Sequence, residues 1–218
     1  MECCSPALVN KIATHAQCIA AATAAEHDLN AFAAKDPASR GSVEEIALGY
    51  SSYKAVLHYR LAHAILHMAS LDGDRNREIA SVAALVSARG KLLSGAEIHP
   101  RCHIGRRLVL DHGWGTVIGE TSRIGDDCYI LGGVVLGATG IAANPSGKRH
   151  PTLGNRAEIG AFARIFGDIV IGDDVFVSPH CVITENIPSD SVVTLKSALQ
   201  LTRKRKSKDP ARTLLDLS

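Results

Sequence analysis

The chain has 218 residues, of which 46% are hydrophobic and 21% charged, and its formal net charge is +2 at pH 7. This composition is typical of an ordinary globular protein, and the small net charge argues against a protein dedicated to nucleic acid. We see no secretory leader, no apolar run of 18 residues and no CxxC pair among the six cysteines. We therefore expect a reduced, cytoplasmic protein with neither a membrane nor a nucleic-acid partner.

The sequence pattern of residues 1–95 predicts a helical N-terminal domain. Apolar residues recur at helical spacing from Leu8 to Ile19 and again from Ile46 to Ile65, and a further helix is expected over about 75–94. Between the first two stripes, Asp36 precedes a proline, and such a residue avoids the α region. Asp36 is therefore a helix stop, whatever further role it has.

A different period begins at residue 96, where an aliphatic residue returns at every sixth position. A helix repeats near 3.6 residues and a strand at 2, so a sustained period of six predicts a parallel β-coil with three flat sides and eighteen residues per turn. The residue two positions before each aliphatic one is mostly small or β-branched, which suits coils stacked about 4.8 Å apart. The aliphatic positions are Ile98, Ile104, Leu110, Ile118, Ile124, Ile130, Leu136, Leu153, Ile159, Ile165, Ile171, Val177 and Ile183.

These patterns give the fold class and the domains. We expect an α+β chain, with a helical domain over 1–95, a parallel β-helix of hexapeptide repeats over 96–190 and a basic C-terminal tail over 191–218. The basic run from Arg203 to Lys208 could contact an anionic cofactor or nucleic acid, but such a run is more often a solvated tail.

Chemically useful residues gather where the six-residue period is interrupted. Asp111 and His112 stand at a two-residue slip in the register, and Arg149 and His150 close the longest interruption. Glu97 opens the first turn of the coil and is expected one turn away from His112. An imidazole beside a carboxylate can take a proton from a hydroxyl group, so we expect an acid–base site here.

The motifs at these places resemble those of the serine O-acetyltransferases, a family of the hexapeptide-repeat acyltransferases. The resemblance covers about residues 30–190 and implies a left-handed β-helix that transfers the acetyl group of acetyl-CoA to the hydroxyl of L-serine. The product would be O-acetylserine, an intermediate of cysteine biosynthesis. The matching motifs are Asp36-Pro37-Ala38, Ile98-His99-Pro100, Ile104-Gly105, Leu110-Asp111-His112, Gly119-Glu120-Thr121, Leu136-Gly137-Ala138-Thr139-Gly140 and Arg149-His150-Pro151.

The resemblance implies roles for four residues of the first half of the site. His112 matches the general base that deprotonates the serine hydroxyl. Glu97 stands where the family has an aspartate that orients this histidine, so the charge is kept and the side chain is one methylene longer. Asp36 and Asp111 match the carboxylates that hold the substrate ammonium.

The other half of the site follows by the same resemblance. Arg149 and His150 match the pair that holds the carboxylate and the reacting end of serine. Backbone groups of Ala138, Thr139 and Ala161 match contacts to acetyl-CoA, and no metal is implied.

The resemblance also implies an assembly. The family's site lies between the subunits of a homotrimer, and trimers often pair through the helical domain. Partnership with cysteine synthase is not expected, because the chain has Ser218 at its end where the family uses an isoleucine.

Three alternative functions remain open from the sequence. A hexapeptide acyltransferase could use a different hydroxy amino acid, an amino acceptor or a different acyl donor. A zinc enzyme on a β-helix would need a set of three histidines at a spacing that we do not find. A non-catalytic scaffold would have no use for the charged pairs at the interruptions.

Overall fold

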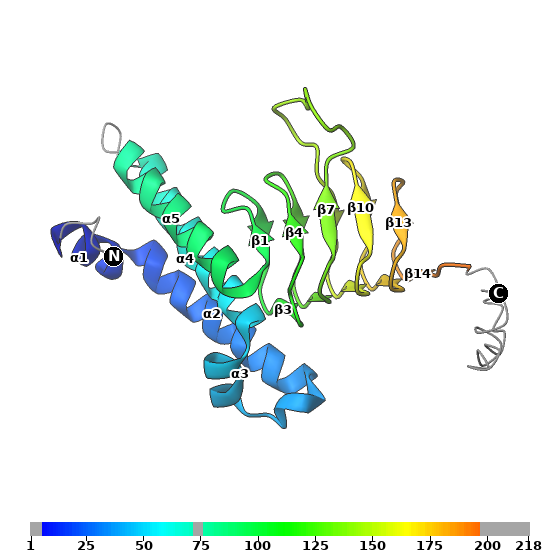
Figure 1. Cartoon of the computed structure of the whole chain (residues 1–218), viewed down its shortest axis with the longest axis horizontal. Helices are drawn as coiled ribbons and strands as arrows, with labels where there is room; N and C mark the ends of the chain where they lie inside the picture. The colour runs from blue at the N-terminus through cyan, green and yellow to red at the C-terminus, as the bar shows by residue number, and fades with distance from the viewer. Residues whose placement is uncertain (1–5, 72–75, 197–218) are drawn as a thin grey trace, which may run out of the picture.

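The structure, a computed structural model, describes residues 6–71 and 76–196. Most of the predicted basic tail, with the run from Arg203 to Lys208 and Ser218, lies outside the described residues. The helices occupy the N-terminal part, as predicted (Figure 1). They are α1 (Pro6–Thr14), α2 (Ala16–Lys35), the 3-10 helix η1 (Pro37–Ser39), α3 (Val43–Gly49), α4 (Ser51–Leu71) and α5 (Asn76–Ser94).

The ends of these helices have local causes. Helix α2 ends at Lys35, and the Asp36 carboxylate accepts a hydrogen bond from the Ala38 N–H at 2.9 Å, which caps η1. Ser42 caps α3 by accepting a hydrogen bond from the Glu45 N–H at 3.1 Å. The apolar stripe from Ile46 to Ile65 is split by Tyr50, whose backbone is extended.

The described part of the chain then forms fourteen short strands in three parallel sheets, which is the predicted β-helix. Sheet A contains β1-β4-β7-β10-β13, sheet B contains β11-β8-β5-β2, and sheet C contains β14-β12-β9-β6-β3. The strands are β1 (Glu97–Ile98), β2 (His103–Ile104), β3 (Val109–Leu110), β4 (Val117–Ile118), β5 (Arg123–Ile124), β6 (Tyr129–Ile130), β7 (Val135–Gly137), β8 (Thr152–Leu153), β9 (Glu158–Ile159), β10 (Arg164–Phe166), β11 (Val170–Ile171), β12 (Phe176–Val177), β13 (Val182–Ile183) and β14 (Val192–Val193).

The chain passes from sheet A to B, from B to C and from C back to A, and we name the three edges of the prism the A–B, B–C and C–A corners. All thirteen predicted aliphatic residues point inward and are at most 5% exposed. Each such burial stabilises the fold by about 1.5–3 kcal/mol. At the B–C corner a Cβ on Gly125 would lie 2.7 Å from the Gly154 carbonyl oxygen, so close stacking of the coils requires glycine there.

Three cysteines serve as small apolar residues inside the coil, as predicted. Cys102, Cys128 and Cys181 are at most 3% exposed. Burial raises the pKa of Cys102 to about 12 and the pKa of Cys128 to about 11, so both thiols stay protonated and unreactive at neutral pH.

The helices cover the first turn of the coil (Figure 1). Val56 and Tyr59 of α4 join the apolar core of the coil, and the Tyr59 hydroxyl donates a hydrogen bond to the Cys102 carbonyl at 2.9 Å. Phe32 of α2 packs with Val109 of β3. Among the described helices none is both long enough and apolar enough to cross a bilayer.

Candidate active site

The C–A corner after β3 carries the register slip predicted from the sequence. Later coils turn this corner with one left-handed residue, such as Gly133, Phe162 or His180. Four residues join β6 to β7 there, whereas six residues, 111–116, join β3 to β4. The two extra residues push His112 outward, where its side chain is 83% exposed and its φ is +60°. Histidine adopts this conformation more readily than most residues.

A cleft of about 310 Å³ lies between this corner and the helices, and it brings together three of the predicted residues. Asp36 comes from the end of α2, and Asp111 and His112 come from the corner. Gly113 makes the close approach possible, because a Cβ there would lie 2.8 Å from Cβ of Ser52. The residues that line the cleft are Asp36, Ala38, Gly49, Tyr50, Ser51, Ser52, Asp111 and His112.

The cleft suits a cation because two carboxylates face it. Asp111 accepts a hydrogen bond from the Tyr129 hydroxyl at 3.0 Å and lies 3.8 Å from Nε2 of His112. Asp36 is only 7% exposed. Burial, and then the charge of Asp111, raise the pKa of Tyr129, while burial and then Asp36 raise the pKa of Tyr50. Both phenols therefore remain protonated at neutral pH and can donate hydrogen bonds.

Glu97 does not contact His112 in this single chain. It points outward from β1 and forms an ion pair with Lys91 of α5. The backbone of Glu97 is paired with Val117, so it lies on the coil next to the strand that follows His112. Its role as the orienting acid stays a prediction.

Arg149 and His150 lie at the A–B corner, across sheet A from His112. Thr121 on the neighbouring coil accepts hydrogen bonds from the N–H groups of Arg149 and His150 at 3.0 and 3.1 Å. The Thr121 N–H donates to Nδ1 of His150 at 3.2 Å, so the ring proton sits on Nε2. Burial, followed by the charges of Arg149 and Lys148, lowers the pKa of His150, which is therefore neutral at neutral pH.

The Gly119-Glu120-Thr121 motif thus has a structural role that sequence reasoning missed. Besides the Thr121 contacts, Glu120 pairs with the Arg149 guanidinium, which lowers the pKa of Glu120. A Cβ on Gly119 would lie 2.2 Å from Nε2 of His150, so only glycine leaves room for the ring. The hexad register contained the signal, because Ile124 pairs with Leu153 and so places the two motifs on neighbouring coils.

The residues predicted to contact acetyl-CoA fall on both edges of sheet A. Ala138 and Thr139 follow β7 at the A–B corner, and Ala161 follows β9 at the C–A corner. Apart from Glu97, which lies in sheet A itself, the predicted residues therefore form two groups in one chain, separated by the width of sheet A. Sequence reasoning missed Tyr50 and Tyr129, which belong to the group around His112, because Tyr50 continues the apolar stripe of a helix and Tyr129 is an outward residue of the repeat.

Within residues 6–71 and 76–196, no group of three or more His, Cys, Asp or Glu side chains is arranged to hold a metal ion. The expected absence of a metal stays a prediction.

Known proteins were compared with the chain by sequence and by structure. No family model matches the chain. It is 42% identical to a serine acetyltransferase of Helicobacter pylori over 171 residues, which cover 78% of this chain and 92% of that protein.

The structural comparisons point the same way. Serine acetyltransferase isoform 3 of Entamoeba histolytica, solved with cysteine, matches 97% of this chain and 70% of its own with a TM-score of 0.76 at 29% identity. The Neisseria gonorrhoeae enzyme, solved with serine, matches 86% of this chain and 70% of its own with a TM-score of 0.71 at 30% identity. The predicted activity, acetyl transfer to serine, is the one for which these relatives are named, and the chain belongs to the serine acetyltransferase family.

Proposed function

We propose that the chain transfers an acetyl group directly from acetyl-CoA to L-serine, with His112 as the general base. The supporting observation is the cleft in which Asp36, Asp111 and His112 meet. Serine has one ammonium group, one carboxylate and one weakly acidic hydroxyl. Two carboxylates beside an imidazole suit the ammonium and the hydroxyl, and Arg149 suits the carboxylate.

The reaction needs no covalent enzyme intermediate. His112 takes the hydroxyl proton as the serine oxygen attacks the thioester carbonyl, and the tetrahedral adduct collapses with loss of the C–S bond. The thiolate then takes the proton from the imidazolium. Asp111, at 3.8 Å from Nε2 of His112, stabilises that cation. Glu97 orients the imidazole ring after its ion pair with Lys91 breaks and its carboxylate binds His112 instead. Base catalysis typically contributes about 10²–10⁴-fold, and fixing both reactants contributes effective molarities of about 10⁵–10⁸ M.

The complete site forms between copies of the chain. One chain carries His112 on one edge of sheet A and Arg149 on the other, so a head-to-tail contact joins the two groups. Three such contacts close a ring, which makes a homotrimer the smallest complete assembly. Acetyl-CoA would then lie between Ala161 of one copy and Ala138 and Thr139 of the next. Pairing of trimers through the helices and a cytoplasmic location complete the proposal.

In this arrangement His150 is a donor and not a second base. Its Nδ1 is occupied by the Thr121 N–H, and its Nε2–H is left to donate to an oxygen of serine or of the thioester. The neutral ring avoids a second positive charge beside Arg149.

A thiol-release assay with acetyl-CoA tests the acceptor. We expect L-serine to release CoA much faster than 3-hydroxypropionate, which lacks the ammonium, or ethanolamine, which lacks the carboxylate. Each analogue isolates one half of the site. If another hydroxy amino acid or an amine releases CoA faster than L-serine, that compound and not serine is the acceptor. No release above the acceptor-free rate would refute the proposal.

Mixing two inactive variants tests the assembly. His112→Asn chains and Arg149→Met chains, refolded together in equal amounts, should regain about a quarter of the parent activity. One interface in four then pairs an intact His112 with an intact Arg149 of the neighbour. Activity that stays at the level of the separate variants would place both groups in a site within one chain.

A further inference from the structure

A stripe of three residues on helix α2 contacts the coil or the helix beside it. Asp28, Phe32 and Lys35 are spaced i, i+4 and i+7, which puts them on one side of a helix. Asp28 and Phe32 are each 1% exposed. Asp36, at the end of this helix, lines the cleft described above.

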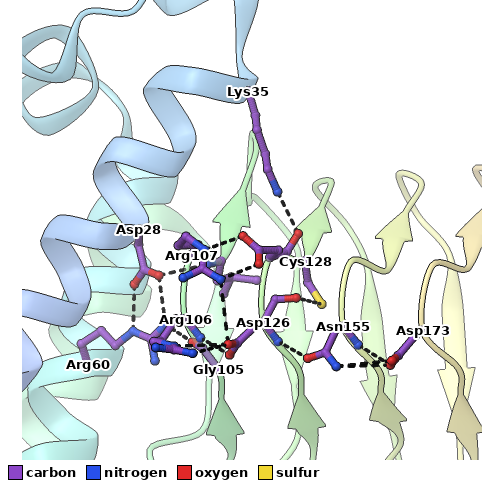
Figure 2. A network of polar contacts seen from close by, with 12 residues as sticks. Asp28, Lys35, Arg60, Gly105, Arg106, Arg107, Asp126, Cys128, Asn155 and Asp173 are labelled. Carbon is purple, nitrogen blue, oxygen red and sulfur yellow. Dashed lines mark hydrogen bonds and ion pairs between the residues drawn. The ribbon is translucent and has the colours of Figure 1, made fainter.

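The first contact of the stripe is a buried ion pair at the B–C corner (Figure 2). Both oxygens of Asp28 accept hydrogen bonds from the guanidinium of Arg60 on α4, at 2.8 and 3.0 Å. Arg60 also donates to the carbonyl of Ile104 at 2.7 Å and to that of Gly105. Asp28 in turn accepts the N–H of Leu108 at 2.9 Å. The ion pair therefore joins helices α2 and α4 to both sides of the B–C corner between β2 and β3.

The second contact lies seven residues further along α2, about 10 Å away. Nζ of Lys35 donates to the carbonyl oxygen of Asp127 at 2.8 Å, on the next coil of the same corner (Figure 2). The Asp127 carboxylate accepts hydrogen bonds from the guanidinium of Arg107. Lys35 therefore binds the backbone carbonyl of Asp127 and not its carboxylate.

Between these two contacts, Phe32 packs with Val109 of β3, and β3 leads directly into Asp111. Helix α2 is thus fixed along its axis and around it, relative to the strand that carries the other carboxylate. This matters because Asp36 stands between two helices: the C-terminal end of α2 repels its carboxylate, whereas the Ala38 N–H at the start of η1 binds it. The carboxylate of Asp111 in the same cleft repels it as well.

We propose that Asp28, Arg60 and Lys35 are positioning residues for the acceptor site, and that they hold Asp36 opposite Asp111 so that two carboxylates share one ammonium. This inference rests on the proposed function, in which that ammonium belongs to serine. The three residues do not touch the substrate and act through Asp36.

Lys35→Met is the variant for the test, because it keeps about the length of the side chain and removes the ammonium group, which is both the hydrogen-bond donor and the charge. We expect the serine KM to rise about five- to tenfold, with kcat and the KM for acetyl-CoA unchanged. Lys35→Arg keeps a donor and should restore the parent KM. Arg156→Met is the matched control, since Arg156 lines the same surface cleft as Lys35 but pairs with Asp174 of the coil itself. Its serine KM should equal that of the parent.

A double-mutant cycle with Asp36→Asn separates positioning from a general structural effect. If Lys35 acts through Asp36, Lys35→Met should change the serine KM little in the Asp36→Asn background. An unchanged KM in the single variant, or the same increase in both backgrounds, overturns the positioning role and leaves the proposed function intact. A parent enzyme with no serine-dependent thiol release overturns both.

Discussion

Replacing His112 by asparagine should lower kcat about a hundredfold or more and leave the fold intact. Loss of a general base typically costs about 10²–10⁴ in rate. Asparagine is the suitable replacement because it tolerates the left-handed backbone at φ +60°, where alanine would add strain. The side chain is 83% exposed, so its removal opens no cavity. The measurement is kcat at saturating serine and acetyl-CoA.

His180→Asn is the matched control for this variant. His180 also has a positive φ, of 63°, and lies at the same corner of the last coil, where its ring stacks on Phe162. Its kcat should stay at the parent value, which excludes a general effect of a changed corner. A His112→Asn enzyme with kcat within about threefold of the parent would remove His112 from the chemistry.

The β-helix was predictable because its signal is local and repeated. Every inward position of the coil has the same buried environment. Each aliphatic residue, such as Ile98 or Ile118, therefore indicates its own burial from the sequence alone. The helices were predicted less well. The apolar stripe runs on through Tyr50 because residues on both sides of the break, Ile46 and Tyr53, pack in the same cluster with Val109. The periodic pattern of apolar residues therefore predicts which face is buried, but it does not predict that the helix is interrupted at Tyr50.

The sequence marks candidate residues for the site but not the contacts between them. The slip in the period marked His112, and the motifs marked Asp36, but nothing local joins them. Their meeting depends on the docking of α2, to which the ion pair of Asp28 and Arg60 contributes from positions that no motif contains. In the same way Thr121 acts largely through hydrogen bonds with backbone N–H groups, which leave no mark in a sequence.

Replacing Asp28 by alanine should lower the free energy of unfolding by about 3–5 kcal/mol, the usual cost of leaving one member of a buried ion pair alone. Asp28 is 1% exposed and Arg60 is 8% exposed, so water cannot solvate the remaining guanidinium. The Leu108 N–H would also lose its acceptor. Burial raises the pKa of Asp28, and the hydrogen bonds and charge of Arg60 oppose this change.

Urea unfolding at one fixed protein concentration measures this change, because assembly would otherwise add to the apparent stability. Asp174→Ala is the control: its ion pair with Arg156 has similar geometry on the same corner, but the side chains are 42% and 54% exposed. Solvent and salt screen such a pair, so its loss should change the free energy of unfolding little. Asp28→Asn, which keeps an acceptor for Leu108 and loses the charge, should fall between the two. Equal stabilities for Asp28→Ala and Asp174→Ala would mean that the hydrophobic contacts of Phe32 alone dock α2, and the polar contacts on either side of it would then be dispensable for the fold.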